Sequence, residues 1–286
     1  MRREGVLLLG GAGFIGSALA ARLKKEKMSV YVLGRHEGEQ LEHVLPQCGT
    51  VIHLASTTTP ASSATNPDLE LANLALTLRL LKLLKGQPET HLIFFSSGDT
   101  VYGNPDRLPV NEDAPIAPLS TYGAGKAAQE NFCQAFRSQG HAATIFRPSN
   151  VYGPGQSIQH GFGLIRTMLE HARHGTAFEI WGDGENVRDF IYIDDIVEAS
   201  IHLLKRPKDS GTYNLGSGIG YSINQVKGIV EAVCRVELKT IHRPARDIDV
   251  RSVVLDSSGL NARLGWEPSV GLEEGKARSW EWLQQA

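Results

Sequence analysis

The sequence contains few cysteines and few aromatic residues. Only three of its 286 residues are cysteine, and 7% are aromatic. Cys48, Cys133 and Cys234 lie far apart in the chain, fit no metal-binding spacing and cannot all pair with one another. A disulfide framework and a cysteine-based metal centre are therefore excluded, and we expect reduced thiols in a cytoplasmic protein.

The sequence also lacks a long apolar run and a strong charge of either sign. No stretch approaches the roughly 18 uncharged apolar residues of a membrane span. Arg2 and Arg3, an apolar run and Ala18-Leu19-Ala20 imitate a bacterial signal peptide, but glycines interrupt the run and weaken it as a helix. The net charge of −2 offers no footprint for nucleic acid. The expected partner is a small molecule.

What the first half does contain is an alternation of strand and helix patterns. Short apolar runs ended by Gly, Ser or Pro are typical of parallel strands buried on both faces. They are Val6 to Leu9, Val30 to Leu33, Val51 to Leu54, Leu92 to Phe95 and Ala143 to Phe146. Helical patterns lie between them at Ile15 to Lys25, Asp68 to Lys85 and Tyr122 to Arg137. This alternation predicts an α/β fold with a Rossmann-like, doubly wound parallel sheet.

A glycine-rich turn joins the first strand to the first helix. The spacing of Gly10, Gly13 and Gly16 allows a tight turn, close approach of a pyrophosphate and close packing of the helix on the strand. The start of the helix adds N–H groups and a positive dipole end. This context predicts a dinucleotide-binding site.

The end of the second strand bears on which dinucleotide binds. An acid there normally binds the 2′-hydroxyl of the adenosine ribose, but the chain has Arg35 and no acid before Glu37. The Arg35 guanidinium fits a 2′-phosphate, which favours NADP slightly over NAD. A solvated arginine is the alternative, so both cofactors stay open.

The sequence pattern changes after Pro148. Residues 1–148 are predicted to form the dinucleotide-binding domain, and residues 149–286 mostly a smaller substrate-binding lobe, with some segments returning to the sheet. In the lobe we expect three helices: Leu164 to His174, one capped by Asp194 or Asp195 that runs to about Lys205, and one capped by Ser222 that runs to Cys234.

Tyr122 and Lys126 begin the helix that follows a strand ending in Ser96-Ser97. Residues four apart share one face of a helix, so the phenol and the ammonium emerge side by side. A neighbouring cation favours the phenolate form of a tyrosine and makes it a usable base near neutral pH. This pair predicts acid/base catalysis.

Together these motifs resemble the extended short-chain dehydrogenase/reductases, the NAD-dependent epimerase/dehydratase family. The similarity rests on Gly10-x-x-Gly13-x-x-Gly16, His53-Leu-Ala55, Ser96-Ser97, Tyr102-Gly103, Tyr122-x-x-x-Lys126, Asn150-Val-Tyr-Gly-Pro154 and Arg188-Asp-Phe-Ile-Tyr-Ile-Asp-Asp195. It covers nearly the whole chain in the family's order. Within the family the chain is most similar to UDP-sugar 4-epimerases and their nucleotide-sugar relatives.

The resemblance implies roles for individual residues. Tyr122 would be the acid/base, and Lys126 would bind the nicotinamide ribose and assist Tyr122. Ser97 and Thr100 would complete the catalytic set. The cofactor would contact Gly10, Gly13, Phe14, Ile15, Gly16, Arg35, Leu54, Ala55, Asn73, Tyr122, Lys126 and Pro148. The substrate would contact Ser97, Gly98, Asn150, Arg188 and Arg251, with both arginines on the diphosphate, because guanidinium groups suit phosphate oxygens.

The chain departs from the family pattern in two places. The family has serine or threonine where this chain has Gly98, so Ser97 or Thr100 must supply the hydrogen bond to the sugar oxygen, unless water does. Of the Thr-Asp-Glu sequence of sugar 4,6-dehydratases only Asp99 is present, which argues against dehydration. Between Arg35 and His53 there is room for one helix but not for the usual third strand, so either that strand is absent or a loop is missing from the sequence.

The resemblance implies an NAD(P)-dependent 4-epimerase of a UDP-hexose or UDP-N-acetylhexosamine that works through a transient 4-keto intermediate. An NADPH-dependent reductase of nucleotide 4-ketosugars uses the same residues, and Arg35 keeps it open. A non-catalytic protein that senses the dinucleotide is the third interpretation, against which the Tyr122/Lys126 pair argues.

The helix over residues 68–85 is apolar on nearly every side. Its leucines are Leu69, Leu71, Leu74, Leu76, Leu78, Leu80, Leu81, Leu83 and Leu84. One apolar stripe is enough to cover a sheet, so a second buried side is expected. With the helix over 122–137, it predicts a two-fold homodimer through four helices, in contact at Leu74, Leu78 and Leu81. Cover by another part of the same chain is the alternative.

Overall fold

The computed structural model describes residues 4–34, 36–158, 162–206, 209–246 and 249–285. The chain divides into two units. Unit 1 contains Met1–Ser97, Thr121–Arg147 and Val197–Tyr213, and unit 2 contains Gly98–Ser120, Pro148–Ile196 and Asn214–Ala286. The sequence predicts one boundary, after Pro148. In the structure residues 98–120, which precede this boundary, belong to unit 2, and residues 197–213, which follow it, belong to unit 1.

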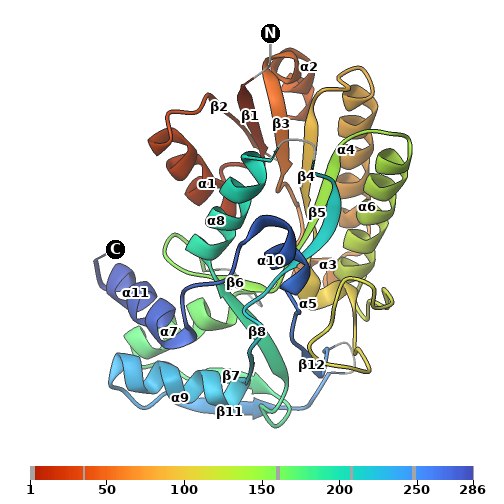
Figure 1. Ribbon diagram of the computed structural model, residues 1–286. Coiled ribbons are helices and arrows are strands. Elements are labelled where there is room, and N and C mark those ends of the chain that lie inside the picture. Colours follow the sequence, from red (N-terminus) through yellow and green to blue (C-terminus); the bar gives the residue numbers. More distant parts are fainter. Residues whose placement is uncertain (1–3, 35, 159–161, 207–208, 247–248, 286) are drawn as a thin grey trace. The chain divides into compact units, whose positions relative to one another are not determined.

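Unit 1 is built on a parallel sheet with the strand order β2-β1-β3-β4-β5-β9. The strands are β1 (Gly5–Leu9), β2 (Val30–Leu33), β3 (Cys48–His53), β4 (His91–Phe95), β5 (Ala143–Pro148) and β9 (Gly211–Leu215). All pairs from β2 to β5 are parallel. The five strands predicted in the first half of the chain are present, which confirms the α/β sheet, and β9 is a later segment that joins it (Figure 1).

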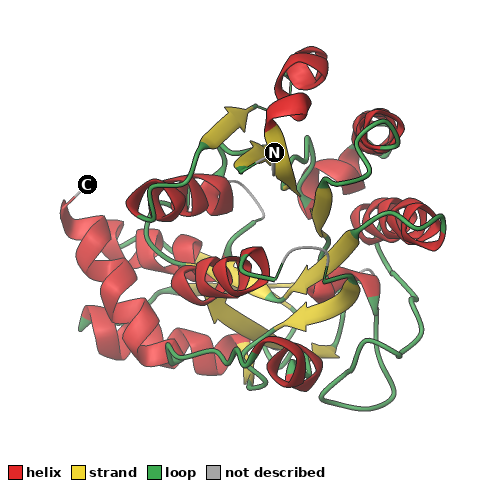
Figure 2. Ribbon diagram, turned by 45° about the horizontal axis from the view of Figure 1, so that its top comes forward, coloured by secondary structure: helices red, strands yellow, loops and turns green. Residues whose placement is uncertain are grey.

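The helices of unit 1 follow the predicted alternation. They are α1 (Phe14–Lys25), α2 (Leu41–Val44), α3 (Pro60–Thr65), α4 (Leu69–Leu84), α6 (Thr121–Ser138) and the part of α8 (Ile193–Leu204) from Val197 onward, with 3₁₀ turns η1 (Gly38–Gln40) and η2 (Leu45–Gln47). Helices α4 and α6 pack side by side, as Figures 1 and 2 show.

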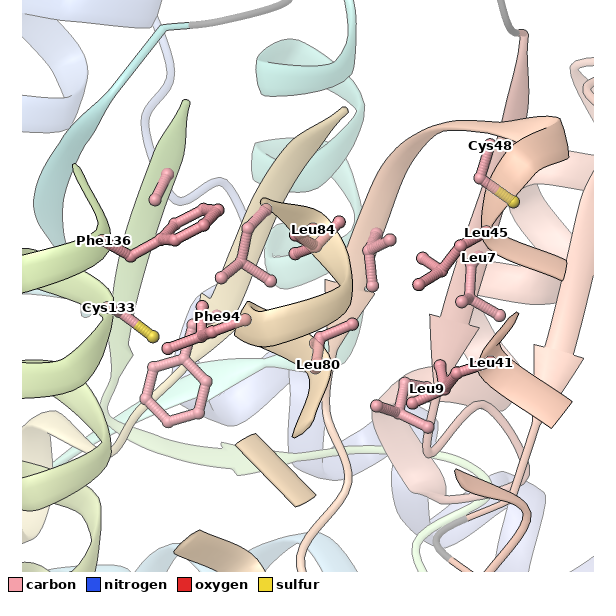
Figure 3. Packing of buried hydrophobic residues seen from close by; sticks show 14 of the residues in the cluster. Leu7, Leu9, Leu41, Leu45, Cys48, Leu80, Leu84, Phe94, Cys133 and Phe136 are labelled. Atoms are coloured by element: carbon pink, nitrogen blue, oxygen red, sulfur yellow. The ribbon is translucent and has the colours of Figure 1, made fainter. Parts of the chain in front are cut away.

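The main core of unit 1 lies between one face of the sheet and α2, α4 and α6. Alternate strand residues such as Leu7, Leu9 and Phe94 point to this face, where Leu80 of α4 and Phe136 of α6 meet them (Figure 3). Side chains two apart on a strand share a face, so a run such as GVLLL supplies apolar groups to both sides of the sheet. The continuous apolar runs follow from this double burial.

The connection from β2 to β3 is short. It consists of η1, α2 and η2, and its Leu41 and Leu45 are buried in the core of unit 1. Among the described residues, β2 pairs with β1 alone and ends the sheet. The chain thus passes directly from β2 to β3, as expected if the third strand is absent.

Unit 2 carries a smaller set of strands. They are β6 (Asn150–Tyr152), β7 (Phe178–Trp181), β8 (Val187–Tyr192), β10 (Gly220–Ser222), β11 (Thr240–Arg243) and β12 (Ser252–Val253). Strand β8 is central, with β10, β12 and β6 paired to it, while β7 pairs with β11. The helices are α5 (Gly98–Val101), α7 (Leu164–His174), α9 (Ile223–Cys234), α10 (Ser258–Leu264) and α11 (Leu272–Gln285), of which α7, α9 and α11 pack on one another.

Of the helix caps predicted in this part of the chain, one is confirmed and one is wrong. Ser222 caps α9 in a capping box with Gln225, as predicted. Helix α8 begins at Ile193, so Asp194 and Asp195 lie inside its first turn and do not cap it. The Asp195 carboxylate instead accepts hydrogen bonds from Ser269 N (2.9 Å) and Ser269 Oγ (2.8 Å), so it holds the segment that precedes α11.

The helix pair α4 and α6 presents an apolar surface. Leu71, Leu78 and Phe132 are 64%, 44% and 40% exposed. Leu81 was expected on this surface, but it is only 6% exposed because it packs into the core against the sheet. The expected contact through Leu81 is therefore wrong, while Leu78 is exposed and Leu74 half-buried, so the homodimer through these two leucines stays a prediction.

Candidate active site

The glycine-rich turn leaves space for close backbone contacts that a side chain would block. Gly10 has a positive φ of 88°, and a Cβ there would lie 2.5 Å from the backbone N of Ala55. A Cβ at Gly16 would lie 2.5 Å from Gly11 Cα. Gly10 therefore makes the turn against the end of β3, and Gly16 lets α1 pack on the turn, as expected of a dinucleotide-binding site.

The first turn of α1 contains Phe14, Ile15 and Gly16. Gly13 is the exposed N-cap, and neither a capping side chain nor an acid occupies this end of the helix. The first N–H groups of a helix have no acceptor within the helix, and they carry the positive end of its dipole. These residues fit the diphosphate of a dinucleotide.

The structure brings other predicted cofactor residues to the same end of the sheet. Leu54 follows β3 and donates its backbone N–H to Leu9 O (2.8 Å), which places Leu54 and Ala55 beside the glycine turn. Pro148 is the last residue of β5 and is buried. Arg35 lies outside the described residues.

Asn73 lies in α4 with every polar atom of its amide bonded. Its Oδ1 accepts from Thr57 N (2.8 Å) and Thr57 Oγ1 (3.0 Å). Its Nδ2 donates to Thr58 Oγ1 (2.9 Å) and to Glu70 Oε2 (2.9 Å). The segment after β3 is therefore fastened to α4 through one buried side chain.

Tyr122 and Lys126 lie near one another on the first turns of α6. Lys126 Nζ lies 6.0 Å from the centre of the Tyr122 ring and 5.2 Å from that of Phe94. It donates a hydrogen bond to Phe95 O (3.0 Å) at the end of β4. Burial lowers the pKa of Lys126 to about 8, with Glu70 and Glu130 acting in the opposite direction. The ammonium is thus charged below about pH 8 and held against the sheet.

A buried histidine completes the surroundings of Lys126. His53, the last residue of β3, is within hydrogen-bond distance of Thr77 Oγ1 through Nε2 (3.0 Å). Burial, and then the charge of Lys126, lower the pKa of His53 to about 3. The imidazole is therefore neutral at physiological pH and does not compete with Lys126 for a negative partner.

In unit 2, two of the predicted substrate residues lie on paired strands and a third directly precedes another strand of the same sheet. Asn150 begins β6 and Arg188 is on β8, and these strands pair with each other. Arg251 precedes β12, which pairs with β8 so that Val253 is opposite Arg188. The Arg251 side chain is exposed, while its backbone N–H donates to Asn104 Oδ1 (2.6 Å).

Asp99 links the first two of these residues. Asn150 Nδ2 donates to Asp99 Oδ1 (2.8 Å), and Arg188 Nε lies 3.5 Å from the same oxygen. In the sequence Asp99 stands out only as the one matching residue of a dehydratase pattern, which does not indicate this contact. No spacing rule predicts it, because residues 99, 150 and 188 are brought together only by the fold.

Asp189 fixes the strand that carries Arg188. Its side chain is fully buried and accepts hydrogen bonds from Ser217 N (2.8 Å), Ser217 Oγ (2.7 Å) and Leu255 N (3.1 Å). Burial raises its pKa, and these hydrogen bonds oppose the rise. The segments that contain Ser217 and Leu255 are thus both held to β8 by one carboxylate.

Gly98, Ser97 and Thr100 lie at the end of β4 and in α5. Gly98 is buried as the first residue of α5, while Ser97 and Thr100 on either side of it are half-buried. Both hydroxyl residues therefore remain candidates for the bond to the sugar oxygen. In the part of the chain that the structure describes, no group of His, Cys, Asp and Glu could hold a metal ion, and no helix could cross a membrane.

Comparisons with known proteins identify the family. The model of the NAD-dependent epimerase/dehydratase family matches residues 6–216. The chain is 29% identical to a putative UDP-glucose 4-epimerase of Methanocaldococcus jannaschii, over 98% of both chains. It is also 29% identical to a dTDP-4-dehydro-6-deoxyglucose reductase of Escherichia coli, over 96% of both.

Solved structures show the same fold. A UDP-glucose 4-epimerase of Thermotoga maritima with UDP-glucose has a TM-score of 0.92 at 29% identity, over 98% of this chain and 99% of that one. A UDP-glucose 4-epimerase of Thermus thermophilus in complex with NAD has a TM-score of 0.91 at 29% identity, over 99% of both. The chain belongs to the NAD-dependent epimerase/dehydratase family and is an enzyme of the extended short-chain dehydrogenase/reductase type.

Proposed function

We propose that this enzyme is a UDP-sugar 4-epimerase that uses NAD and acts in the cytoplasm. The observation that carries the proposal is the Lys126 ammonium, which is buried, bonded to Phe95 O and close to the Tyr122 ring. A fixed cation beside a phenol favours phenolate, the form that can remove a proton from a sugar hydroxyl. The three free, buried cysteines fit a reducing compartment.

In this proposal unit 2 binds the nucleotide. Arg188 and Arg251 bind the diphosphate through charge-assisted hydrogen bonds, and Asn150 orients the same group. Asp99 holds the Asn150 amide and faces the Arg188 guanidinium before the substrate binds. Less side-chain freedom is then lost on binding.

The residues around Tyr122 move the proton. Tyr122 removes the proton of the sugar 4-hydroxyl and later returns one to the same oxygen of the 4-keto intermediate. Ser97 or Thr100 donates a hydrogen bond to that oxygen. Lys126 stays charged and stabilises the phenolate, while the bound nicotinamide supplies the hydride acceptor and donor. Inversion requires the 4-keto sugar to turn and present its other face.

We propose NAD as the cofactor because the related Thermus thermophilus structure contains it. The sequence favoured NADP slightly through Arg35. Replacement of Arg35 by aspartate tests this choice. The dissociation constants for NAD and NADP are measured for both proteins. If the variant prefers NAD over NADP more strongly than the unmodified enzyme does, Arg35 contacts the 2′-phosphate of NADP. An unchanged ratio would remove the argument for NADP.

Reduction of a nucleotide 4-ketosugar is the second candidate, supported by the similarity to the Escherichia coli reductase. The two reactions differ in their redox balance. Epimerisation returns the hydride to the sugar and consumes no cofactor, whereas reduction consumes one NADPH for each product. We therefore expect purified enzyme to interconvert UDP-glucose and UDP-galactose, or the N-acetylated pair, without added NADPH. Turnover of a 4-ketosugar alone, with stoichiometric loss of NADPH absorbance, would establish the reductase instead.

Replacement of Tyr122 by phenylalanine tests the proposed acid/base. The variant keeps the ring near Lys126 but loses the transferable proton, so kcat should fall roughly 10²–10⁴-fold while cofactor affinity is almost retained. Tyr31→Phe is the control, because it removes a hydroxyl that bonds to Gln47 at the edge of the sheet (2.8 Å). Activity of the Tyr122 variant within threefold of the unmodified enzyme would contradict the assignment.

A further inference from the structure

Glu70 carries a buried carboxylate that the proposed reaction does not use. It lies in the first turn of α4 and is 8% exposed. Oε2 accepts the hydrogen bond from Asn73, but Oε1 is buried without a hydrogen-bond partner among the described residues. Burying a carboxylate oxygen in this way is unfavourable, so the residue calls for a functional explanation.

The carboxylate is fitted against the helix that carries the catalytic pair. A Cβ added at Gly125 would lie 2.5 Å from Glu70 Oε2 and 2.8 Å from Glu70 Cδ. Gly125 lies inside α6 between Tyr122 and Lys126. Glycine weakens a helix interior relative to alanine, so its advantage at position 125 is the space that it leaves for Glu70.

Two acids, Glu70 and Glu130, raise the pKa of Lys126 against the effect of burial. Glu130 on α6 forms a buried bidentate pair with Arg147 (Nη2 to Oε2, 2.7 Å), so its charge is already matched. His53 is neutral, and burial raises the pKa of the Cys133 thiol to about 12, so that it is neutral too. Of these groups, Glu70 is therefore the one whose charge acts on Lys126 without being matched by an arginine.

The same carboxylate determines how Asn73 is oriented. Because Glu70 Oε2 is an acceptor only, it requires the amide nitrogen of Asn73 on its side. The amide oxygen then points to Thr57, whose N–H and hydroxyl donate to it. Glu70 therefore contacts the helix of the catalytic pair and the predicted nicotinamide-binding residue at once.

We propose that Glu70 is a positioning residue of the active site: its buried carboxylate, seated against Gly125, orients Asn73 and keeps the Lys126 ammonium charged. The inference rests on the proposed function, in which charged Lys126 assists Tyr122. It assigns a role to a residue on a different helix from the catalytic pair. It also explains why α6 has glycine at position 125.

Glu70→Gln tests the inference, because glutamine has the same size and keeps an oxygen for Asn73 but removes the charge. The pKa of Lys126 is followed by the 13C shift of its Cε in lysine-labelled enzyme, with Lys126→Met to assign the signal. We expect that pKa to fall by about one unit, since a nearby opposite charge favours the charged form. The alkaline limit of kcat should move down by the same amount. Asp68→Asn, an exposed carboxylate at the start of α4, is the matched control and should shift neither.

Gly125→Ala is a second variant that displaces the carboxylate without removing its charge. It should lower the pKa of Lys126 by less than Glu70→Gln, and the double variant should equal Glu70→Gln alone. An unchanged Lys126 signal in both single variants, with epimerase activity intact, would overturn the inference and leave the proposed function standing. A shifted Lys126 signal in an enzyme that turns over no UDP-sugar would support the inference and refute the function.

Discussion

Lys276 lies on α11 with no exposed surface, and its Nζ donates a hydrogen bond to Val226 O on α9 (3.0 Å). Burial lowers its pKa from the ordinary 10.5 to about 7, although Glu273 and Cys234 act in the opposite direction. An amine in this position is stable when neutral and unfavourable when charged. The free energy of unfolding should therefore depend on pH through this residue.

The sign and the magnitude follow from proton linkage. Between about pH 7 and pH 10.5 the unfolded chain holds a proton on Lys276 that the folded chain has lost. Stability rises with pH wherever the unfolded state binds more protons. At pH 7 Lys276 is protonated in about half of the folded molecules. The free energy of unfolding should therefore rise by about 1.5 kcal/mol between pH 7 and about pH 8.5.

Lys276→Met removes this dependence and keeps a side chain of similar length. Val226 O lies inside a helix and retains its helical hydrogen bond, so the variant leaves no unpaired carbonyl. Denaturant unfolding at a series of pH values should show the unmodified protein gaining about 1.5 kcal/mol more than the variant over this range. Other titrating groups, Lys126 included, are common to both proteins and cancel.

Lys239→Met, which removes an exposed lysine beyond the end of α9, controls for the loss of a positive charge. It should follow the unmodified protein at every pH. Parallel curves for Lys276→Met and the unmodified protein would refute the reasoning, because they would mean that Lys276 keeps its proton in the fold.

Three further predictions concern binding, assembly and the core. Arg188→Ala and Arg251→Ala should each weaken UDP binding roughly tenfold or more, since a charge-assisted hydrogen bond contributes about 1.5–3 kcal/mol; equal affinities by calorimetry would exclude a contact with the diphosphate. Leu78→Glu, on the exposed face of α4, should convert a dimer into a monomer in sedimentation equilibrium, and a monomeric unmodified protein would contradict the assembly. Glu130→Ala should lower the free energy of unfolding by about 3–5 kcal/mol, because it removes the ion-pair partner of the buried Arg147 guanidinium; a loss below 1 kcal/mol would contradict this.

Local patterns predicted most of the fold of unit 1. The runs around Leu7 and Phe94 are apolar at every position because both faces of the sheet are covered, and this double burial makes such strands easy to find in a sequence. Gly10 and Gly16 were predicted for steric reasons that the backbone confirms. In each case a local sequence pattern was sufficient to predict the feature.

The errors arise where a side chain serves a distant segment. Asp194 and Asp195 have the composition of a helix cap, but Asp195 binds the backbone before α11, some 75 positions away in the chain. The apolar pattern of α4 is compatible with two positions for Leu81, in the core of unit 1 or on a surface that contacts a second subunit. Which position Leu81 takes depends on where the sheet lies against the helix. Composition fixes what such residues can bind but not which partner they meet.

The same limit explains why the sequence predicted that Tyr122 and Lys126 lie together but not that Glu70 lies against the same helix. Tyr122 and Lys126 lie four apart on one helix, so their proximity follows from helix geometry alone. Glu70 is more than fifty positions earlier, and its contact with Gly125 exists only because α4 packs on α6. A buried ammonium requires a nearby negative charge to stay protonated, whichever segment supplies it. Acids on helices packed against a catalytic lysine are therefore the first residues to test in a chain of this fold.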